Sequence, residues 1–170
     1  MPLIRPEQSR DFELVHALLL ASFGRDGEAR LVDRLRASGK ITSALVAEEK
    51  ERILGLVVFS KVATDAEGGE ASALALAPLA VAPAFQRLGI GSALVSAGLE
   101  RCRLERHSLV LVLGVPVYYA LFGFVPAARF GLKCPFPASN SSFMSMELEP
   151  GAFAKASGTV RYGHEFDDLE

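Results

Sequence analysis

Residues 71 to 85 form a run of apolar residues that only Ser72 breaks, and this run limits the possible folds. This run is shorter than the roughly 20 residues that a membrane-spanning helix needs, and Pro78 and Pro83 interrupt it. Such a run is typical of a strand that is buried on both faces of a sheet. We therefore predict a central strand over residues 71–81 and no membrane partner.

Periodic apolar residues on either side of this strand predict the remaining elements. Helices are expected over residues 7–23, 28–37, 89–106 and 116–122, and strands over residues 3–5, 44–47, 53–59, 109–113, 143–148 and 158–162, with another beginning at 124. Ser9 is the expected cap of the first helix. Residues 64–70 are expected to form a polar loop, and residues 165–170 a loose acidic tail. The order predicts an α/β (α+β) domain with a mixed, mostly antiparallel central sheet flanked by helices, because hairpin-connected strands do not build a doubly wound parallel sheet.

Length and charge limit the domain organisation and the classes of partner. A chain of 170 residues is about one domain, so we expect a single domain over residues 1–170, with residues 158–170 as a C-terminal extension. The formal net charge of −2 gives no general attraction for a polyanion, which argues against nucleic-acid binding. Cys102 and Cys134 are too few for a disulfide scaffold. With no secretion signal in residues 1–11, these thiols predict a cytoplasmic protein.

The turn after the central strand has the composition of an anion site. Gly89 and Gly91 let the backbone approach a ligand, and the start of the following helix offers unpaired N–H groups and the positive end of its dipole. Arg87 adds a positive charge at the same place. The alternative is a glycine-containing turn that binds nothing. The segment is neither a Walker A loop nor a dinucleotide fingerprint.

Two motifs in this order resemble the GNAT superfamily of acyl-CoA N-acyltransferases. The segment Gln86-x-x-Gly89-x-Gly91 matches the Gln/Arg-x-x-Gly-x-Gly/Ala motif that follows the family's fourth strand. Residues 119–124 resemble its Tyr-x-x-x-Gly-Phe segment, and the element order from residue 3 to 148 also fits. Residues 113–119 and 157–162 are similar to a bacterial subgroup of predicted N-acetyltransferases. That subgroup often has an acid where this chain has Val115.

The resemblance implies a GNAT-like domain whose fourth and fifth strands splay apart around acetyl-CoA. The residues implied to bind the pantetheine arm through their backbone are Leu79, Ala80 and Val81, and those implied to surround the pyrophosphate are Gln86, Arg87, Leu88, Gly89, Ile90, Gly91 and Ser92. The implied reaction is transfer of an acetyl group to a primary amine by direct attack in a ternary complex. A backbone N–H near Val81 would stabilise the oxyanion.

The resemblance also implies candidate catalytic residues. Tyr119 matches the family's general acid, since a phenol stays protonated at neutral pH and can donate to the departing thiolate. The alternative is that Tyr119 packs in the protein while Tyr118 is functional. Glu28, at the start of the second helix, is the candidate base. Asp26, Glu70 and a chain of waters remain alternatives, and a solvated surface charge is the alternative for each carboxylate.

The expected partners follow from the same residues. The acceptor is a small-molecule or peptide amine that the sequence does not identify. No metal is expected, because His16, His107 and His164 lack ligand spacing and no Cys/His cluster exists. A non-catalytic acyl-CoA-binding or regulatory module on the same fold is the alternative function. A homodimer is a further expectation, because exposed final strands can pair.

Overall fold

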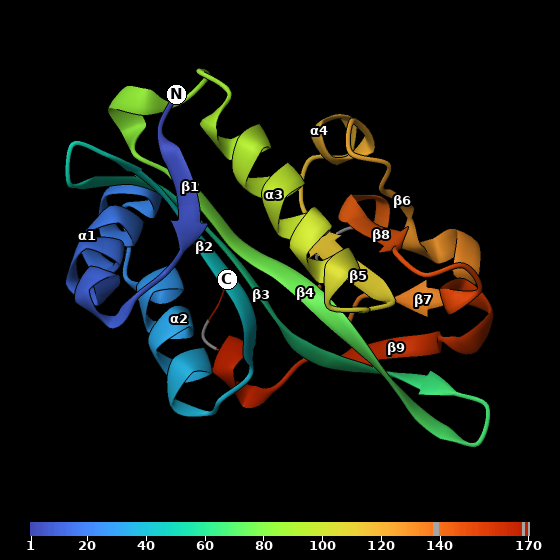
Figure 1. The fold of residues 1–170 in the computed structure, drawn as a ribbon. Helices are drawn as coiled ribbons and strands as arrows, with labels where there is room; N and C mark the ends of the chain where they lie inside the picture. The colour runs from blue at the N-terminus through green and yellow to red at the C-terminus, as the bar shows by residue number, and fades with distance from the viewer. Residues whose placement is uncertain (138–139, 168, 170) are drawn as a thin grey trace. The chain divides into compact units, whose positions relative to one another are not determined.

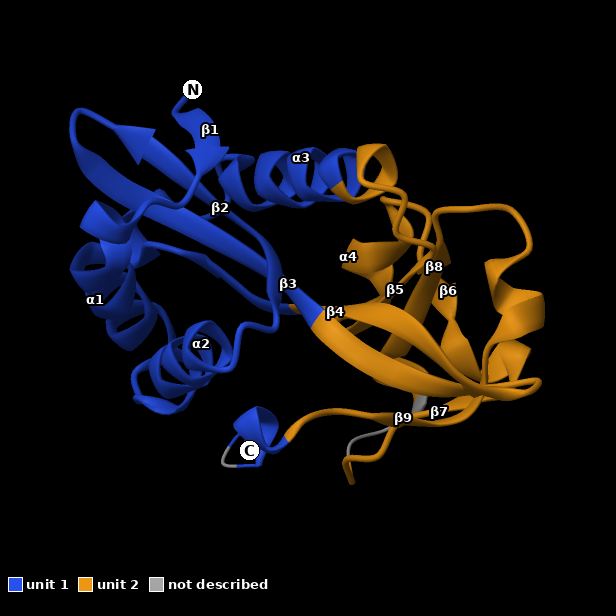
Figure 2. Ribbon diagram, turned by 60° about the horizontal axis from the view of Figure 1, so that its bottom comes forward, with its two compact units in different colours: residues 1–60, 77–101, 164–170 blue, residues 61–76, 102–163 orange. Residues whose placement is uncertain are grey.

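The computed structural model describes residues 1–137, 140–167 and 169. The chain divides into two compact units, coloured blue and orange in Figure 2. Unit 1 comprises residues 1–60, 77–101 and 164–170, and unit 2 comprises residues 61–76 and 102–163. Strands β3 (Arg52–Ala66) and β4 (Gly69–Val81) each continue from one unit into the other. A single domain over residues 1–170 stays a prediction.

Unit 1 holds the N-terminal strands and the longer helices. Its elements are β1 (Leu3–Pro6), α1 (Phe12–Phe23), α2 (Gly27–Ala37), β2 (Ile41–Glu49), the first part of β3, the end of β4 and most of α3 (Ile90–Leu104). β2 pairs antiparallel with both β1 and β3 (Figure 1). Leu56 and Val58 of β3 share a buried cluster with α1 and α2. Gly55 and Phe59 are on the other face of β3, because successive residues of a strand alternate between its faces, and they lie against α3. The helices therefore cover opposite faces of these strands.

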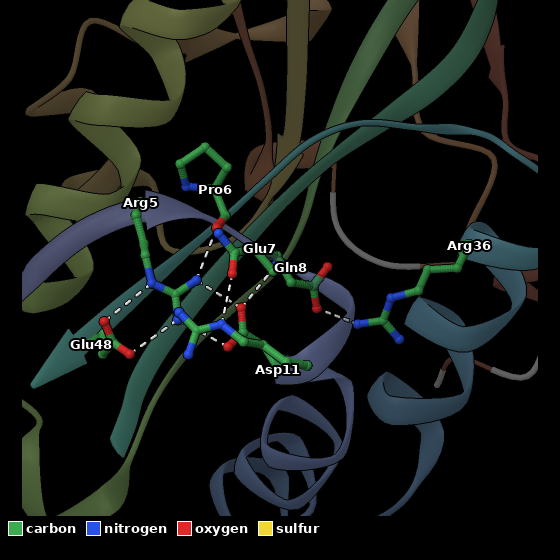
Figure 3. A network of polar contacts seen from close by, with 8 residues as sticks. Arg5, Pro6, Glu7, Gln8, Asp11, Arg36 and Glu48 are labelled. Carbon is green, nitrogen blue, oxygen red and sulfur yellow. Dashed lines mark hydrogen bonds and ion pairs between the residues drawn. The ribbon is translucent and has the colours of Figure 1, made fainter. Parts of the chain in front are cut away.

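Ion pairs fix the connection between β1 and α1 (Figure 3). The Arg5 guanidinium donates to Asp11 at 2.8 and 2.9 Å and to Glu48 at 3.2 Å. Asp11 also accepts the backbone N–H of Gln8 at 2.7 Å. The expectation that Ser9 caps the first helix is wrong. A 3₁₀ turn over Ser9–Asp11 precedes α1, and the Asp11 carboxylate, held by Arg5, bonds the backbone at this entry.

Unit 2 contains the end of β3 and the start of β4. It adds β5 (Leu109–Leu113), α4 (Pro116–Ala120), β6 (Val125–Pro126), β7 (Leu132–Lys133), β8 (Phe143–Glu147) and β9 (Ser157–Arg161). β4 runs parallel to β5, with Leu74 opposite Val110 and Ala75 opposite Leu111. β5 and β6 both pair antiparallel with β8. The predicted mixed, mostly antiparallel sheet flanked by helices is confirmed.

Tertiary contacts overturn two predictions for polar segments. The loop expected over residues 64–70 is a hairpin in which β3 continues to Ala66 and β4 begins at Gly69. Arg161 of β9 forms ion pairs with Asp65 and Glu70, which stabilises these extended strands. The expected loose tail over residues 165–170 is wrong at its start, because residues His164–Phe166 form a 3₁₀ turn with Glu165 buried. Residues 168 and 170 of that tail lie outside the described residues.

The final strand offers no free edge for a dimer. β9 pairs antiparallel with β3 and parallel with β7. Both neighbours come from the same chain, and a homodimer through other exposed strands stays a prediction.

Candidate active site

The end of β4 is fixed within unit 1 by three neighbours. The Val81 carbonyl accepts hydrogen bonds from Ser22 Oγ at 3.2 Å and from Gln86 Nε2 at 3.0 Å. The next residue, Ala82, donates its N–H to the Leu54 carbonyl at 2.8 Å. Ala80 is buried, whereas Leu79 and Val81 are half-buried. The strand end is therefore anchored to α1, β3 and the following loop.

Close packing sets the position of α3. A Cβ at Gly55 of β3 would lie 2.8 Å from Leu94 Cδ1 and 3.2 Å from the Ala80 carbonyl oxygen. A glycine at this position therefore lets the helix approach the sheet more closely than any other residue would. Ile90 and Leu94 are buried in this contact. The first turn of α3 is thereby held close to the end of β4.

The loop between β4 and α3 is exposed and contains residues with positive φ angles. Arg87 has φ 64° and Gly89 φ 88°, and both residues are exposed. The first hydrogen bond of the helix runs from the Ala93 N–H to the Gly89 carbonyl at 3.0 Å. The N–H groups of Ile90 and Gly91 come before this bond and have no acceptor within the helix. Left-handed residues before a helix start form a concave set of N–H groups that suits an anion.

The candidate acid lies in unit 2. Tyr119 is 8% exposed, and its ring packs edge-on against Tyr118 and Phe124, with centroids 5.1 and 5.6 Å away. A Cβ at Gly114 would collide with the same ring, 3.0 Å from Cδ2. Burial, with a smaller contribution from Tyr118, raises the pKa of Tyr119 to about 12. The phenol is therefore protonated throughout the neutral range.

The candidate base is paired with an arginine. Glu28 is 4% exposed, and its two oxygens accept from Arg25 Nε at 3.0 Å and Arg25 Nη2 at 2.7 Å. The adjacent Ala29 belongs to the same buried cluster as Ala80. The alternative carboxylates also have partners: Asp26 pairs with Arg30 in unit 1, and Glu70 with Arg161 in unit 2.

Unit 1 contains the predicted cofactor residues and α2, and Ala80 shares a buried cluster with Ala29 of α2, whereas Tyr119 belongs to unit 2. Ser22 was missed, because a serine within an otherwise apolar helix gives no signal of a contact 59 residues away. In the part of the chain that the structure describes, no cluster of three or more His, Cys, Asp or Glu could hold a metal ion. The helices described there are too short or too polar to cross a membrane.

Comparisons with known proteins agree with this architecture. Residues 3–127 match the family model described as an acetyltransferase (GNAT) domain. The chain is 37% identical to the uncharacterized N-acetyltransferase YhbS of Escherichia coli strain K12, over 97% of this chain and 98% of that protein. It is 34% identical to the uncharacterized N-acetyltransferase YjhQ of the same strain, over 68% of this chain and 66% of that protein.

Two solved structures resemble the chain over nearly its whole length. The crystal structure of YhbS from E. coli in complex with CoA has a TM-score of 0.92 and 36% identity, covering 99% of this chain and 93% of that one. A GNAT family acetyltransferase from Brucella melitensis in complex with acetyl-CoA has a TM-score of 0.80 and 30% identity, covering 98% and 99%. The family match, these similarities and the order of strands and helices lead to one conclusion: this chain is an N-acetyltransferase of the GNAT family.

Proposed function

We propose that this protein transfers an acetyl group from acetyl-CoA to a primary amine by direct attack within a ternary complex. The observation that carries the proposal is the exposed turn at Arg87 and Gly89, which leads from the anchored end of β4 into the first turn of α3. Two similar proteins that cover nearly the whole chain were crystallised with CoA or acetyl-CoA. Acetyl-CoA supplies a thioester whose carbonyl carbon is activated toward an amine.

The residues after β4 fit an anionic cofactor. The segment Gln86–Ser92 would hold the pyrophosphate mainly through backbone N–H groups, and the exposed Arg87 guanidinium would add a charge-assisted contact. Leu79, Ala80 and Val81 would hold the pantetheine arm through their backbone. The Val81 carbonyl already accepts two hydrogen bonds, so at this residue we assign the contact to the N–H group.

The same N–H of Val81 is the proposed donor for the reacting carbonyl oxygen. The neighbouring Ala82 N–H is engaged with Leu54 and is not free for this role. A backbone donor held in a fixed position stabilises negative charge on that oxygen without having to reorganise. In the balanced step, the amine nitrogen bonds to the acetyl carbon while the carbon–sulfur bond breaks.

Two side chains would handle the protons. Tyr119 would donate its phenolic proton to the departing thiolate, since its raised pKa of about 12 keeps it protonated at neutral pH. Glu28 would accept the proton of the acceptor ammonium, directly or through water. The ammonium would compete with the Arg25 guanidinium for this carboxylate, because both Glu28 oxygens accept from Arg25.

Calorimetric titration with acetyl-CoA, followed by measurement of free CoA in the presence of amines, tests the proposal. We expect one-site binding and CoA release that depends on the amine. Binding without release across polyamines, amino acids and peptides would instead favour a non-catalytic acyl-CoA-binding module. The absence of binding at millimolar acetyl-CoA would overturn the cofactor site at Gln86–Ser92. The low number of cysteines, Cys102 and Cys134 alone, supports the proposal that the reaction takes place in the cytoplasm.

A further inference from the structure

A cavity of about 260 Å³ is lined only by residues of unit 2, and three of them are basic. Lys61 belongs to β3, and Arg106 and His107 follow the end of α3. The other lining residues are Ser72, Ala73, Leu74, Ser108 and Leu109. None of these residues is assigned to acetyl-CoA or to the proton transfers, so the cavity is a candidate for a different ligand.

Three polar residues of the cavity lie on one face of the sheet. β4 runs parallel to β5 with Leu74 opposite Val110. Ser72 and Ser108 each come two residues earlier, so they lie on the same face as this pair. A two-residue turn joins β3 to β4 and places Lys61 opposite Leu74 in the hairpin. Lys61 and the two serines therefore border the cavity from the same side.

The lysine and the arginine of the cavity are accessible and unpaired. Lys61 and Arg106 are both exposed. In the part of the chain that the structure describes, neither side chain forms an ion pair or a hydrogen bond. Both side chains can only donate hydrogen bonds. A ligand with several acceptor atoms therefore fits them.

The charges around the cavity favour an anion. His107 is half-buried and lies 3.6 Å from Glu105, which is not among the lining residues. None of the described residues that line the cavity is Asp or Glu. The adjoining hollow adds no net charge, because its charged residues are Lys155 and Glu149. A negatively charged ligand would gain charge-assisted hydrogen bonds that a neutral one would not.

Arg106 has a backbone conformation that favours glycine. Its φ is 63°, in the left-handed position that ends many helices, where a residue with a Cβ is strained. Its N–H donates to the Arg103 carbonyl at 3.0 Å, and the His107 N–H donates to the Cys102 carbonyl at 3.0 Å. These bonds occupy carbonyls at the end of α3 that would otherwise disfavour an anion. Within the described residues no contact of the Arg106 side chain offsets the strain, whereas a bound anion would.

We propose that this cavity is a second ligand site, which binds a small phosphate monoester. A phosphoryl group has three acceptor oxygens and a charge of about −1.5 to −2 at neutral pH, which suits Lys61 and Arg106. The hydroxyls of Ser72 and Ser108 donate to the same group, and Leu74 gives the organic part an apolar contact. The cavity is smaller than the roughly 300 Å³ at which drug-sized pockets begin, so the organic part has only a few atoms.

Titration of the whole protein with glycerol 3-phosphate, followed through the amide NMR signals, tests the site. Acetyl-CoA is present in excess so that the loop over residues 86–92 is occupied, and glycerol is the matched uncharged probe. We expect the signals of residues 106–108 to shift with a millimolar Kd for glycerol 3-phosphate and to stay unchanged with glycerol. Shifts confined to residues 86–92 would place the anion at the loop and overturn the proposal.

Arg106→Gly separates a role in binding from a role in the fold. This variant should weaken glycerol 3-phosphate binding at least fivefold, because one charged contact is lost. It should also raise the Tm without ligand, because glycine adopts a positive φ without strain. Weaker binding that comes with a lower Tm would assign Arg106 to the fold and overturn its role in the site.

Lys50→Gly is the matched control for Arg106→Gly. Lys50 is exposed, positively charged and at φ 51°, but it does not line the cavity. Its replacement should raise the Tm in the same way and leave glycerol 3-phosphate binding unchanged. The proposal is overturned if glycerol 3-phosphate does not bind, if glycerol shifts the same signals equally, or if the two variants weaken binding alike.

Discussion

Lys40 Nζ lies 3.0 Å from Glu165 Oε1, in a hydrogen bond that joins residues 125 positions apart in the sequence. Lys40 stands just before β2, and Glu165, 2% exposed, sits in the last 3₁₀ turn of the chain. This pair fixes the C-terminal segment onto unit 1. Without the Lys40 ammonium, burial of the Glu165 carboxylate would cost free energy, because a buried charge needs a partner.

Glu165 should make stability depend on acid pH. Burial raises its pKa, but hydrogen bonds from Ser38 and the backbone, with the Lys40 ammonium, outweigh burial and lower it to about 2. Against about 4.3 in the unfolded chain, this shift contributes about 3 kcal/mol of stability above pH 5 that is lost as the pH falls toward 2. Urea unfolding at pH 7, 5 and 3 should therefore show a smaller acid loss for Glu165→Gln than for the wild type. Glu67 is exposed, so Glu67→Gln is the control. An equally reduced loss of stability in acid for Glu67→Gln would contradict the assignment of this loss to Glu165.

Tyr119→Phe should lower kcat at least 100-fold while the Kd for acetyl-CoA stays near the wild-type value. A general acid typically contributes a factor of about 10² to 10⁴, and the loss of one hydroxyl leaves the packing of the ring unchanged. The raised pKa of about 12 also predicts no alkaline fall in rate from this group below about pH 10.

Tyr118→Phe is the matched control for that experiment, because Tyr118 is next to Tyr119 in the chain and the two rings pack against each other. It should keep most of the activity. A fall in kcat confined to Tyr118→Phe would assign the acid role to Tyr118.

Gly89→Ala should raise the Kd for acetyl-CoA at least tenfold. Gly89 has φ 88°, which an alanine adopts only with strain, so the loop would rearrange and move the amides ahead of α3. Gly131→Ala is the control, since it has φ 72°, open space around it and no place in the loop. Both variants should lose about 1–2 kcal/mol of stability. Equal effects of the two on acetyl-CoA binding would remove Gly89 from the cofactor site.

Gly98→Ala should lower the free energy of unfolding by about 1–3 kcal/mol, although alanine is the better helix former. A Cβ at this position of α3 would overlap the ring of Phe59, lying 2.8 Å from its Cζ atom. Phe59 is fully buried, so neighbouring residues leave it little room to move. Ser96→Ala, on an exposed position of the same helix, should change stability by less than about 0.5 kcal/mol in the same urea titration. A neutral Gly98→Ala would show that the helix and β3 can separate.

Elements with local signals could be predicted from the amino-acid sequence. The apolar run after residue 71 predicted β4, and Gly89 with Gly91 after it predicted the start of α3. The two motifs in this order also predicted the family. Periodicity and glycine placement depend on neighbours along the chain, which is why they are visible without a structure.

Which polar residues are paired and buried depends on contacts between segments that are distant in the sequence. Residues 64–70 form a hairpin whose strand β3 pairs with β9, and Arg161 of β9 also pairs with Asp65 and Glu70. Glu28 is tied to Arg25, and Ser22 reaches Val81. A charged or hydroxyl side chain has the same local pattern whether it faces water or a buried partner. The free energy of desolvation and pairing depends on residues that only the folded chain brings together.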